Sequence, residues 1–115
     1  MHELSIATAI LDSLEAELEK RPGARFTRVG VRVGELSGVD PDALEFGFGA
    51  LVKETHWEPL ALEIERVPRL QRCPKCGHEW QVERFATDCP QCGELGTVTV
   101  SGEELQIVFI EVEEP

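Results

Sequence analysis

The segment CPKCGHEWQVERFATDCPQC constrains the fold most, because it contains all four cysteines of the 115-residue chain. They form two Cys-x2-Cys pairs, Cys73 with Cys76 and Cys89 with Cys92, separated by twelve residues. A module of roughly 30 residues has too small a core to fold by apolar burial alone, so it needs a covalent or metal crosslink. Paired cysteines at this spacing predict one tetrahedral site with four thiolate ligands.

Zinc is the metal that suits this predicted site best, because Zn(II) accepts four thiolates and orders small modules. Gly77 and Gly93 follow the two pairs and permit tight knuckles. Two disulfides are one alternative, which a cytoplasmic compartment disfavours. Iron is another, because the knuckles resemble those of rubredoxin, although the twelve-residue gap matches a zinc ribbon. We expect Trp80, Val82 and Phe85 to form the apolar patch of the module.

The remaining sequence alternates between helical and strand patterns. A helix is predicted over about residues 4–20, and a second follows Asp40, an N-cap residue placed directly before Pro41. Period-two alternation predicts strands within residues 26–36 and over 60–67. A last strand over residues 105–112 is apolar on both faces, as expected for a central or doubly covered strand. The apolar stripe of the first helix consists of Leu4, Ala7, Leu11, Leu14 and Leu18.

This order predicts a two-layer α/β fold, in which two helices pack on a small mixed three-stranded sheet. Because the last strand returns to that sheet, the cysteine segment is an insertion and not a tail. We therefore expect an α/β domain of residues 1–67 plus 99–115, with an inserted zinc-ribbon module over residues 68–98.

Charge and hydropathy narrow the function classes. The chain carries 22 acidic against 11 basic residues, a net charge of −11, which opposes the basic surface expected of a nucleic-acid-binding protein. No apolar run reaches the length of a membrane span, and acidic residues interrupt the first helix where a signal segment would be apolar. We expect a cytoplasmic protein that binds neither nucleic acid nor membranes.

The N-terminal sequence Met1-His2-Glu3 places metal-ligand chemistry at the start of a helix. The terminal amine, the amide and imidazole of His2, and the amide of Glu3 can form fused chelate rings with four nitrogens in a plane. Such a ligand set suits Ni(II) or Cu(II) better than Zn(II). The alternative is that Glu3 is only a first-turn acid that interacts with the helix dipole. His56 is expected to be an exposed loop residue. His78 is expected to be one too, with the alternative that it replaces a thiolate ligand or relays a metal, because it lies just after the first knuckle.

Taken together, the motifs MHELSIATAI, VRVGELSGVDPDAL, CPKCG and CPQCG make the chain resemble the HypA/HybF family of nickel metallochaperones along essentially its whole length. The resemblance implies that Met1, His2 and Glu3 form the nickel site, and it adds Asp40 as a nickel-site aspartate. It also implies structural zinc on Cys73, Cys76, Cys89 and Cys92.

The same resemblance implies a nickel carrier, not an enzyme. Its implied partners are a HypB-like GTPase, the precursor of the [NiFe]-hydrogenase large subunit and urease accessory proteins. No nucleophilic triad and no glycine-rich phosphate loop can be recognised in the sequence. Two other classes remain open on the residues alone: a zinc-ribbon adaptor without nickel chemistry, and a rubredoxin-like electron carrier.

Overall fold

The computed structural model describes residues 2–115, and Met1 lies outside the described residues. Within that range no helix combines the length and the apolar character needed to cross a membrane. The elements in chain order are α1 (His2–Glu19), β1 (Arg25–Gly34), α2 (Pro41–Val52), β2 (Ala61–Val67), β3 (Leu70–Arg72), β4 (Glu79–Gln81), β5 (Val98–Ser101) and β6 (Leu105–Glu113).

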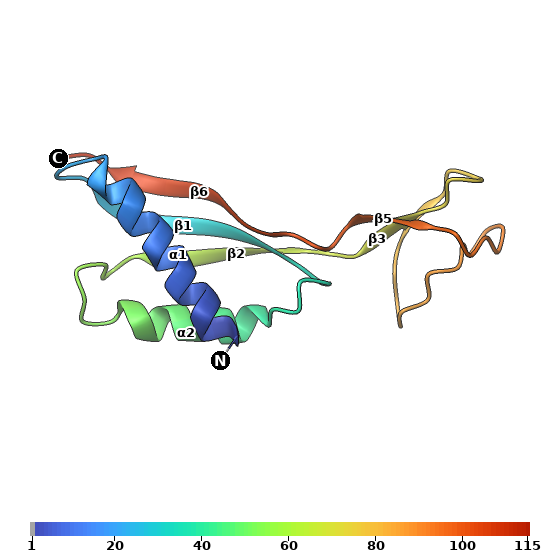
Figure 1. The fold of residues 1–115 in the computed structure, drawn as a ribbon, viewed down its shortest axis with the longest axis horizontal. Coiled ribbons are helices and arrows are strands. Elements are labelled where there is room, and N and C mark those ends of the chain that lie inside the picture. Colours follow the sequence, from blue (N-terminus) through green and yellow to red (C-terminus); the bar gives the residue numbers. More distant parts are fainter. Residues whose placement is uncertain (1) are drawn as a thin grey trace.

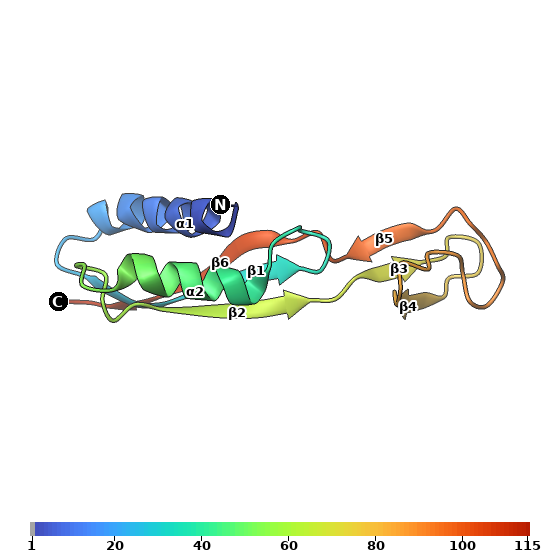
Figure 2. The same cartoon turned by 90° about the horizontal axis from the view of Figure 1, so that it is seen from below.

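The first sheet has the strand order β2-β1-β6, so β1 is the central strand. β1 runs parallel to β2, with α2 as the crossover between them, and antiparallel to β6. Both helices lie on the same face of this sheet (Figure 2). The predicted mixed three-stranded sheet in a two-layer α/β arrangement is therefore confirmed.

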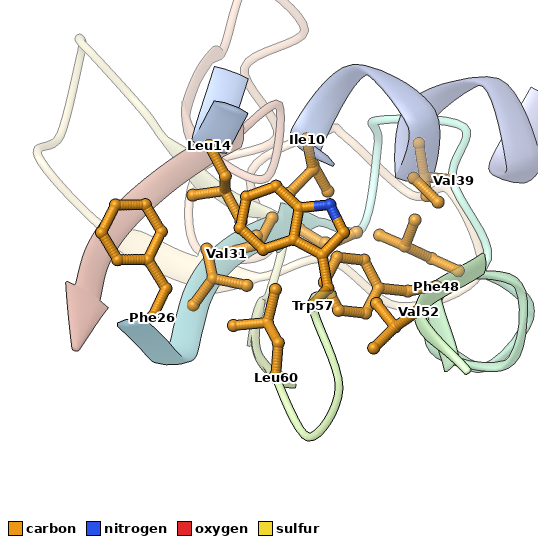
Figure 3. Close-up of a cluster of buried hydrophobic side chains, with 13 residues drawn as sticks. Ile10, Leu14, Phe26, Val31, Val39, Phe48, Val52, Trp57 and Leu60 are labelled. Atoms are coloured by element: carbon orange, nitrogen blue, oxygen red, sulfur yellow. The ribbon is translucent and has the colours of Figure 1, made fainter. Parts of the chain in front are cut away.

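The core lies between this sheet and the two helices (Figure 3). Every second residue of β1 faces the helices, and Val29, Val31 and Val33 are almost fully buried. From α2, the spacing of four residues buries Leu44, Phe48 and Val52. Trp57, in the loop after α2, is also buried, and its ring stacks near that of Phe26 at a centroid distance of 6.3 Å.

The buried stripe of α1 differs from the predicted one. The structure buries Ala7, Ile10 and Leu14, whereas Leu4 is 39% exposed. Steps of three and four along a helix define several overlapping apolar stripes, and the packing partner selects one of them. The predicted stripe was therefore wrong at Leu4 and missed Ile10.

The last strand is not central or doubly covered, so that expectation was wrong. β6 lies at an edge of the sheet, and Phe109 is exposed on the face that has no helices. A register shift between Gly30 and Val31 gives β6 one extra residue, which explains its apolar residues on both faces. The Phe109 ring lies directly over Gly30, where a Cβ would approach Cε2 of that ring to 2.0 Å.

The second sheet has the order β4-β3-β5 and contains the cysteines in its flanking loops. It extends from one end of the first sheet, so the molecule is elongated, with extents of 57 × 27 × 16 Å (Figure 1). Few of its side chains are buried, namely Gln71, Cys73, Val82 and Cys89. The division into residues 1–67 plus 99–115 and residues 68–98 stays a prediction.

Two chain segments, one after β2 and one before β6, connect the sheets, and the end of β1 lies between them. Gly34 N–H donates to Glu104 O at 2.7 Å, and Glu35 N–H donates to Val67 O at 2.9 Å. The Glu35 carboxylate also accepts from Arg69 N–H at 3.0 Å. The junction is thus held by hydrogen bonds from β1 and the loop after it to both connecting segments.

Gly34 is the residue at which this junction leaves no room for a side chain. A Cβ there would lie 2.1 Å from Gly102 O, which is a backbone atom and cannot move aside like a side chain. We predict that Gly34→Ala lowers the free energy of unfolding by about 3 kcal/mol, at the upper end of typical overpacking costs. Urea denaturation followed by circular dichroism measures this change.

Gly49 provides the matched control, because a Cβ there meets nothing within 4 Å and the residue lies inside α2. Gly49→Ala is expected to raise the free energy of unfolding by about 0.5–1 kcal/mol through helix propensity. Equal stabilities of the two alanine variants would contradict the described packing at the junction.

Candidate metal centres

The four cysteines meet at one point in the second module. Their sulfur atoms all lie within 4.8 Å of one another, although Cys73 and Cys76 precede β4 and Cys89 and Cys92 follow it. The sulfur atoms are 3.6 Å apart both between Cys73 and Cys92 and between Cys76 and Cys89. All four are free thiols, so the disulfide alternative is not what the structure contains.

The geometry of the cluster fits a tetrahedral metal ion. Four sulfurs at about 2.3 Å from a central zinc ion would be about 3.8 Å from one another, close to the 3.6 Å between Cys73 and Cys92 and between Cys76 and Cys89. Cys73 and Cys89 are buried, whereas Cys76 and Cys92 are exposed. The cluster therefore has two thiols inside the module and two at its surface.

Each cysteine pair forms a tight knuckle that depends on the following glycine. Gly77 N–H donates to Cys73 O at 2.7 Å, and Gly93 N–H donates to Cys89 O at 2.9 Å. Both glycines have left-handed backbones, with φ of +80° and +79°, a region that glycine adopts without strain. The tight turns predicted at these two glycines are confirmed.

The thiols do not ionise alike. Burial opposes ionisation of Cys89, but backbone N–H donors of Cys92 and Gln91 outweigh it and lower the pKa of the Cys89 thiol to about 7. For Cys92 a backbone N–H of Glu94 favours the thiolate, but the Cys73 thiol and burial raise the pKa to about 12. Four thiolates this close repel one another, so a cation is the natural group to hold all four in the ionised form.

A buried polar network connects the strands with the loop that carries the second knuckle. Gln71 is 3% exposed, and its side chain donates to the Thr97 hydroxyl at 3.1 Å and accepts from the Thr99 hydroxyl at 2.8 Å. The Thr97 hydroxyl in turn donates to Thr87 O. The sequence analysis missed this glutamine, whose only signal is a polar residue at the central position of a short strand.

The predicted apolar patch of the module forms only in part. Val82 is buried and Trp80 is half-buried, stacked on the His78 ring at a centroid distance of 5.7 Å. Phe85 is 86% exposed, so its predicted place in the patch was wrong.

The second candidate centre lies at the start of α1. Met1 is outside the described residues, so the structure describes only His2 and Glu3 of the predicted nickel site. The side chain of His2 is 60% exposed, and its Nδ1 atom lies 3.7 Å from Oε2 of Glu3. His2 is therefore open to an incoming ligand, whereas the Glu3 side chain is 19% exposed.

Glu3 connects the N-terminal ends of both helices. Its Oε2 atom accepts a hydrogen bond from Asp40 N–H at 3.2 Å, directly before α2. This N–H donor, together with the backbone N–H of Glu3 itself, lowers the pKa of the Glu3 carboxyl below its usual range. The start of α1 is thus fixed against the loop that leads from β1 to α2.

Asp40 is the N-cap of α2, as predicted. Its Oδ1 atom accepts from Asp42 N–H at 3.0 Å and from Ala43 N–H at 3.3 Å, and Pro41 occupies the first helical position. The backbone N–H of Asp40 thus contacts Glu3, while the carboxylate of Asp40 caps α2.

His56 lies apart from this group. Its Nε2 atom is 3.2 Å from Oε2 of Glu15, thirteen residues, or about 20 Å, along α1 from His2. Its ring packs on that of Trp57 at 4.6 Å. His56 is accordingly a surface residue beside the loop after α2 and does not belong to either candidate centre.

Comparison with known proteins finds a family and relatives that match nearly the whole chain. The family described as "Hydrogenase/urease nickel incorporation, metallochaperone, hypA" matches residues 1–112. A "Hydrogenase maturation factor HypA" from Geobacter metallireducens is 42% identical over 113 residues, covering 98% of this chain and all of that protein. One of the same name from Chlorobium luteolum is 37% identical over 114 residues, covering 99% and 97%.

Two solved structures share the fold. The "Solution structure of the Ni metallochaperone HypA from Helicobacter pylori" has a TM-score of 0.64 at 20% identity, covering 98% of each chain. The "Solution structure of HypA protein" has a TM-score of 0.71 at 21% identity, covering 100% of this chain and 98% of the other.

The contact between Glu3 and Asp40 predicts a pH-dependent stability difference. Because the pKa of Glu3 is lowered on folding, its contribution is present above the unfolded-state pKa and is lost as the pH falls through the folded-state pKa. We expect wild type to be more stable than Glu3→Gln at pH 7, and we expect a smaller difference at pH 3, below the ordinary glutamate pKa of about 4.3. Urea denaturation at both pH values measures it.

The control for this experiment is Asp12→Asn, in the exposed middle of α1. This change should leave the pH dependence of stability close to that of wild type. A Glu3→Gln difference that stayed constant from pH 7 to pH 3 would show that the carboxylate charge does not matter at this contact.

Proposed function

The chain belongs to the HypA family of hydrogenase and urease nickel-incorporation metallochaperones, and we propose from this that it carries Ni(II) at its N-terminus for hydrogenase maturation. We further propose that Cys73, Cys76, Cys89 and Cys92 hold a structural zinc ion. The protein then acts by binding and releasing metal and catalyses no reaction.

The observation that carries the nickel proposal is the position of His2 at the first residue of α1. The first N–H groups of a helix have no acceptor within the helix, so the amides of His2 and Glu3 are not needed for its hydrogen bonds. The exposed imidazole of His2 lies beside them. A planar site of the Met1 amine, the His2 amide and imidazole, and the Glu3 amide suits the tetragonal preference of Ni(II).

Glu3 and Asp40 have different parts in this proposal. The Glu3 carboxylate accepts from Asp40 N–H, so it fixes the N-terminal segment against the loop before α2. The Asp40 carboxylate already caps α2 through Oδ1, and we propose a direct nickel contact for it only as a secondary ligand. Nickel release then proceeds by ligand exchange, in which a partner's ligand enters above or below the plane of nitrogens.

Zinc has a different role in the proposal, because it crosslinks two loops of a sheet that has little core of its own. The proposed partners are a HypB-like GTPase and the precursor of the hydrogenase large subunit, with urease accessory proteins as further candidates, and we propose that they meet in the cytoplasm. The acidic surface of the chain, with a net charge of −11, favours docking on basic surfaces.

A Ni(II) titration tests the site at the N-terminus. Untagged protein with its native amine is expected to bind one Ni(II) ion with the absorption spectrum of a planar complex. His2→Ala and a form extended by two residues at the N-terminus should each weaken binding by at least about 100-fold, because each removes one nitrogen ligand. Calorimetry with absorption spectra at pH 7.5 provides the measurement.

His56→Ala is the matched control, because it removes an exposed histidine that lies beside Glu15, about 20 Å along α1 from His2. Its nickel affinity should equal that of wild type. If the native, His2→Ala and extended forms bound nickel alike, the N-terminal site would be excluded, and a zinc-ribbon adaptor would be the better account.

Metal removal tests the structural role of the four cysteines. Elemental analysis should find one zinc and no iron per chain, and a strong chelator should remove the order of residues 70–101 while the first sheet stays folded. The physical reason is that four side chains of the module are buried, against thirteen in the core of the first sheet. Amide NMR spectra with and without chelator measure the loss of dispersion.

Cys76→Ser serves as the genetic counterpart of the chelator, because it removes one thiolate at the surface of the cluster. In its amide NMR spectrum, the signals of the module should resemble those of the metal-free protein. Module signals that stayed dispersed without metal would contradict the structural role, and iron in the purified protein would favour the rubredoxin-like alternative.

A further inference from the structure

The turn between β4 and the second knuckle has a backbone conformation that its residue types disfavour. Ala86 N–H donates to Glu83 O at 3.1 Å, and the two central residues, Arg84 and Phe85, have positive φ of 53° and 62°. Positive φ at both central positions characterises a type I′ turn, which is normally built from Asn-Gly or similar residues. Neither arginine nor phenylalanine adopts this conformation without strain.

Other left-handed residues of the described chain have an ordinary explanation. Five are glycines, and Glu54 directly follows the C-cap Lys53 of α2, where left-handed residues commonly end helices. Arg84 and Phe85 therefore stand out as two consecutive strained residues that end no helix.

The strain persists because both ends of the turn are fixed. Val82, on one side, is buried, and its N–H donates to Arg69 O at 3.0 Å. Thr87, on the other side, accepts from the Thr97 hydroxyl. Strain held in this way is typical of functional positions, because the surrounding structure has to maintain it.

The strained turn exposes its two side chains instead of burying them. Phe85 is 86% exposed, the highest value among the large apolar residues of the described chain. Within residues 2–115 the Arg84 guanidinium makes no ion pair with a carboxylate. Phenylalanine and arginine are both enriched in protein interfaces relative to the rest of the surface.

We propose that the Arg84-Phe85 turn is a docking point for the protein that accepts nickel from the N-terminal segment, an inference that rests on the proposed carrier function. The partner surface would offer an apolar pocket for the phenyl ring and a carboxylate for the guanidinium. The segment between β4 and β5 projects from the second sheet toward the side on which α2 and the start of α1 lie (Figure 1). One partner can therefore contact the turn and the N-terminal segment together.

The decisive variant replaces the turn by its favoured sequence, Arg84→Asn with Phe85→Gly. Asn-Gly adopts a type I′ turn without strain, so the thermal midpoint and the zinc content should be unchanged or higher. Binding of the nickel-loaded full chain to purified hydrogenase large-subunit precursor should weaken at least about 30-fold, as for central interface residues. Biolayer interferometry measures the affinity.

Leu95→Ala is the matched control, because Leu95 is 80% exposed in the same module but does not belong to the turn. It should bind the precursor as wild type does. Equal weakening by Leu95→Ala would overturn the proposal, since the effect would not be specific to the turn. Should the double variant lose zinc, Phe85→Gly alone gives the deciding comparison.

The outcomes separate this inference from the proposed function. If wild type binds the precursor and the Asn-Gly variant binds equally well, the docking role is wrong while nickel delivery stands. If wild type with nickel at its N-terminus does not bind the precursor at all, the docking proposal is wrong, whereas the carrier function is decided by the Ni(II) titration. Nickel affinity should be equal in all three chains, because the turn does not belong to the nickel site.

Discussion

The pairing of β1 with strands on both of its edges is the constraint on which the rest of the structure depends. Its valines on one face form the floor on which α1 and α2 pack. At its end the chain contacts both connecting segments of the second sheet and then leads to Asp40, whose N–H holds Glu3. The position of β1 thus determines where the core, the junction and the N-terminal centre lie.

The second module follows a different physical principle. It is held by a thiol cluster and the hydrogen bonds of Gln71 more than by apolar burial. Such a module does not need many large side chains inside, and it can therefore place an aromatic residue such as Phe85 at its surface. The first sheet cannot expose a large apolar side chain at its centre without losing buried apolar area from its core.

Much of the fold could be predicted from the sequence because it depends on local patterns. The alternation of Val29, Val31 and Val33 predicts β1, and Asp40 before Pro41 predicts the start of α2. Cysteine spacing predicts the cluster, because the residues that meet are close in the chain. Residue patterns alone could not predict the contact of Glu3 with Asp40, since it joins two helix ends 37 residues apart, and only the family resemblance placed both residues at one site. Likewise, the place of β6 depends on a register shift, and the exposure of Phe85 on a strained turn, neither of which leaves a pattern in the sequence.

The geometry of the junction also shows how the second sheet is connected to the first. The hydroxyl of Ser101 donates to Pro68 O at 2.9 Å, so the chain leaves for the module and returns from it at adjacent points. β2 and β6 flank β1, and a connection across its end spans only about 10 Å, which about four extended residues cover. A short loop in place of the module would therefore leave the helices and the first sheet topologically complete. Because only two chain segments join the second sheet to the first, changes in the length of the second sheet's loops need not alter the strand order β2-β1-β6.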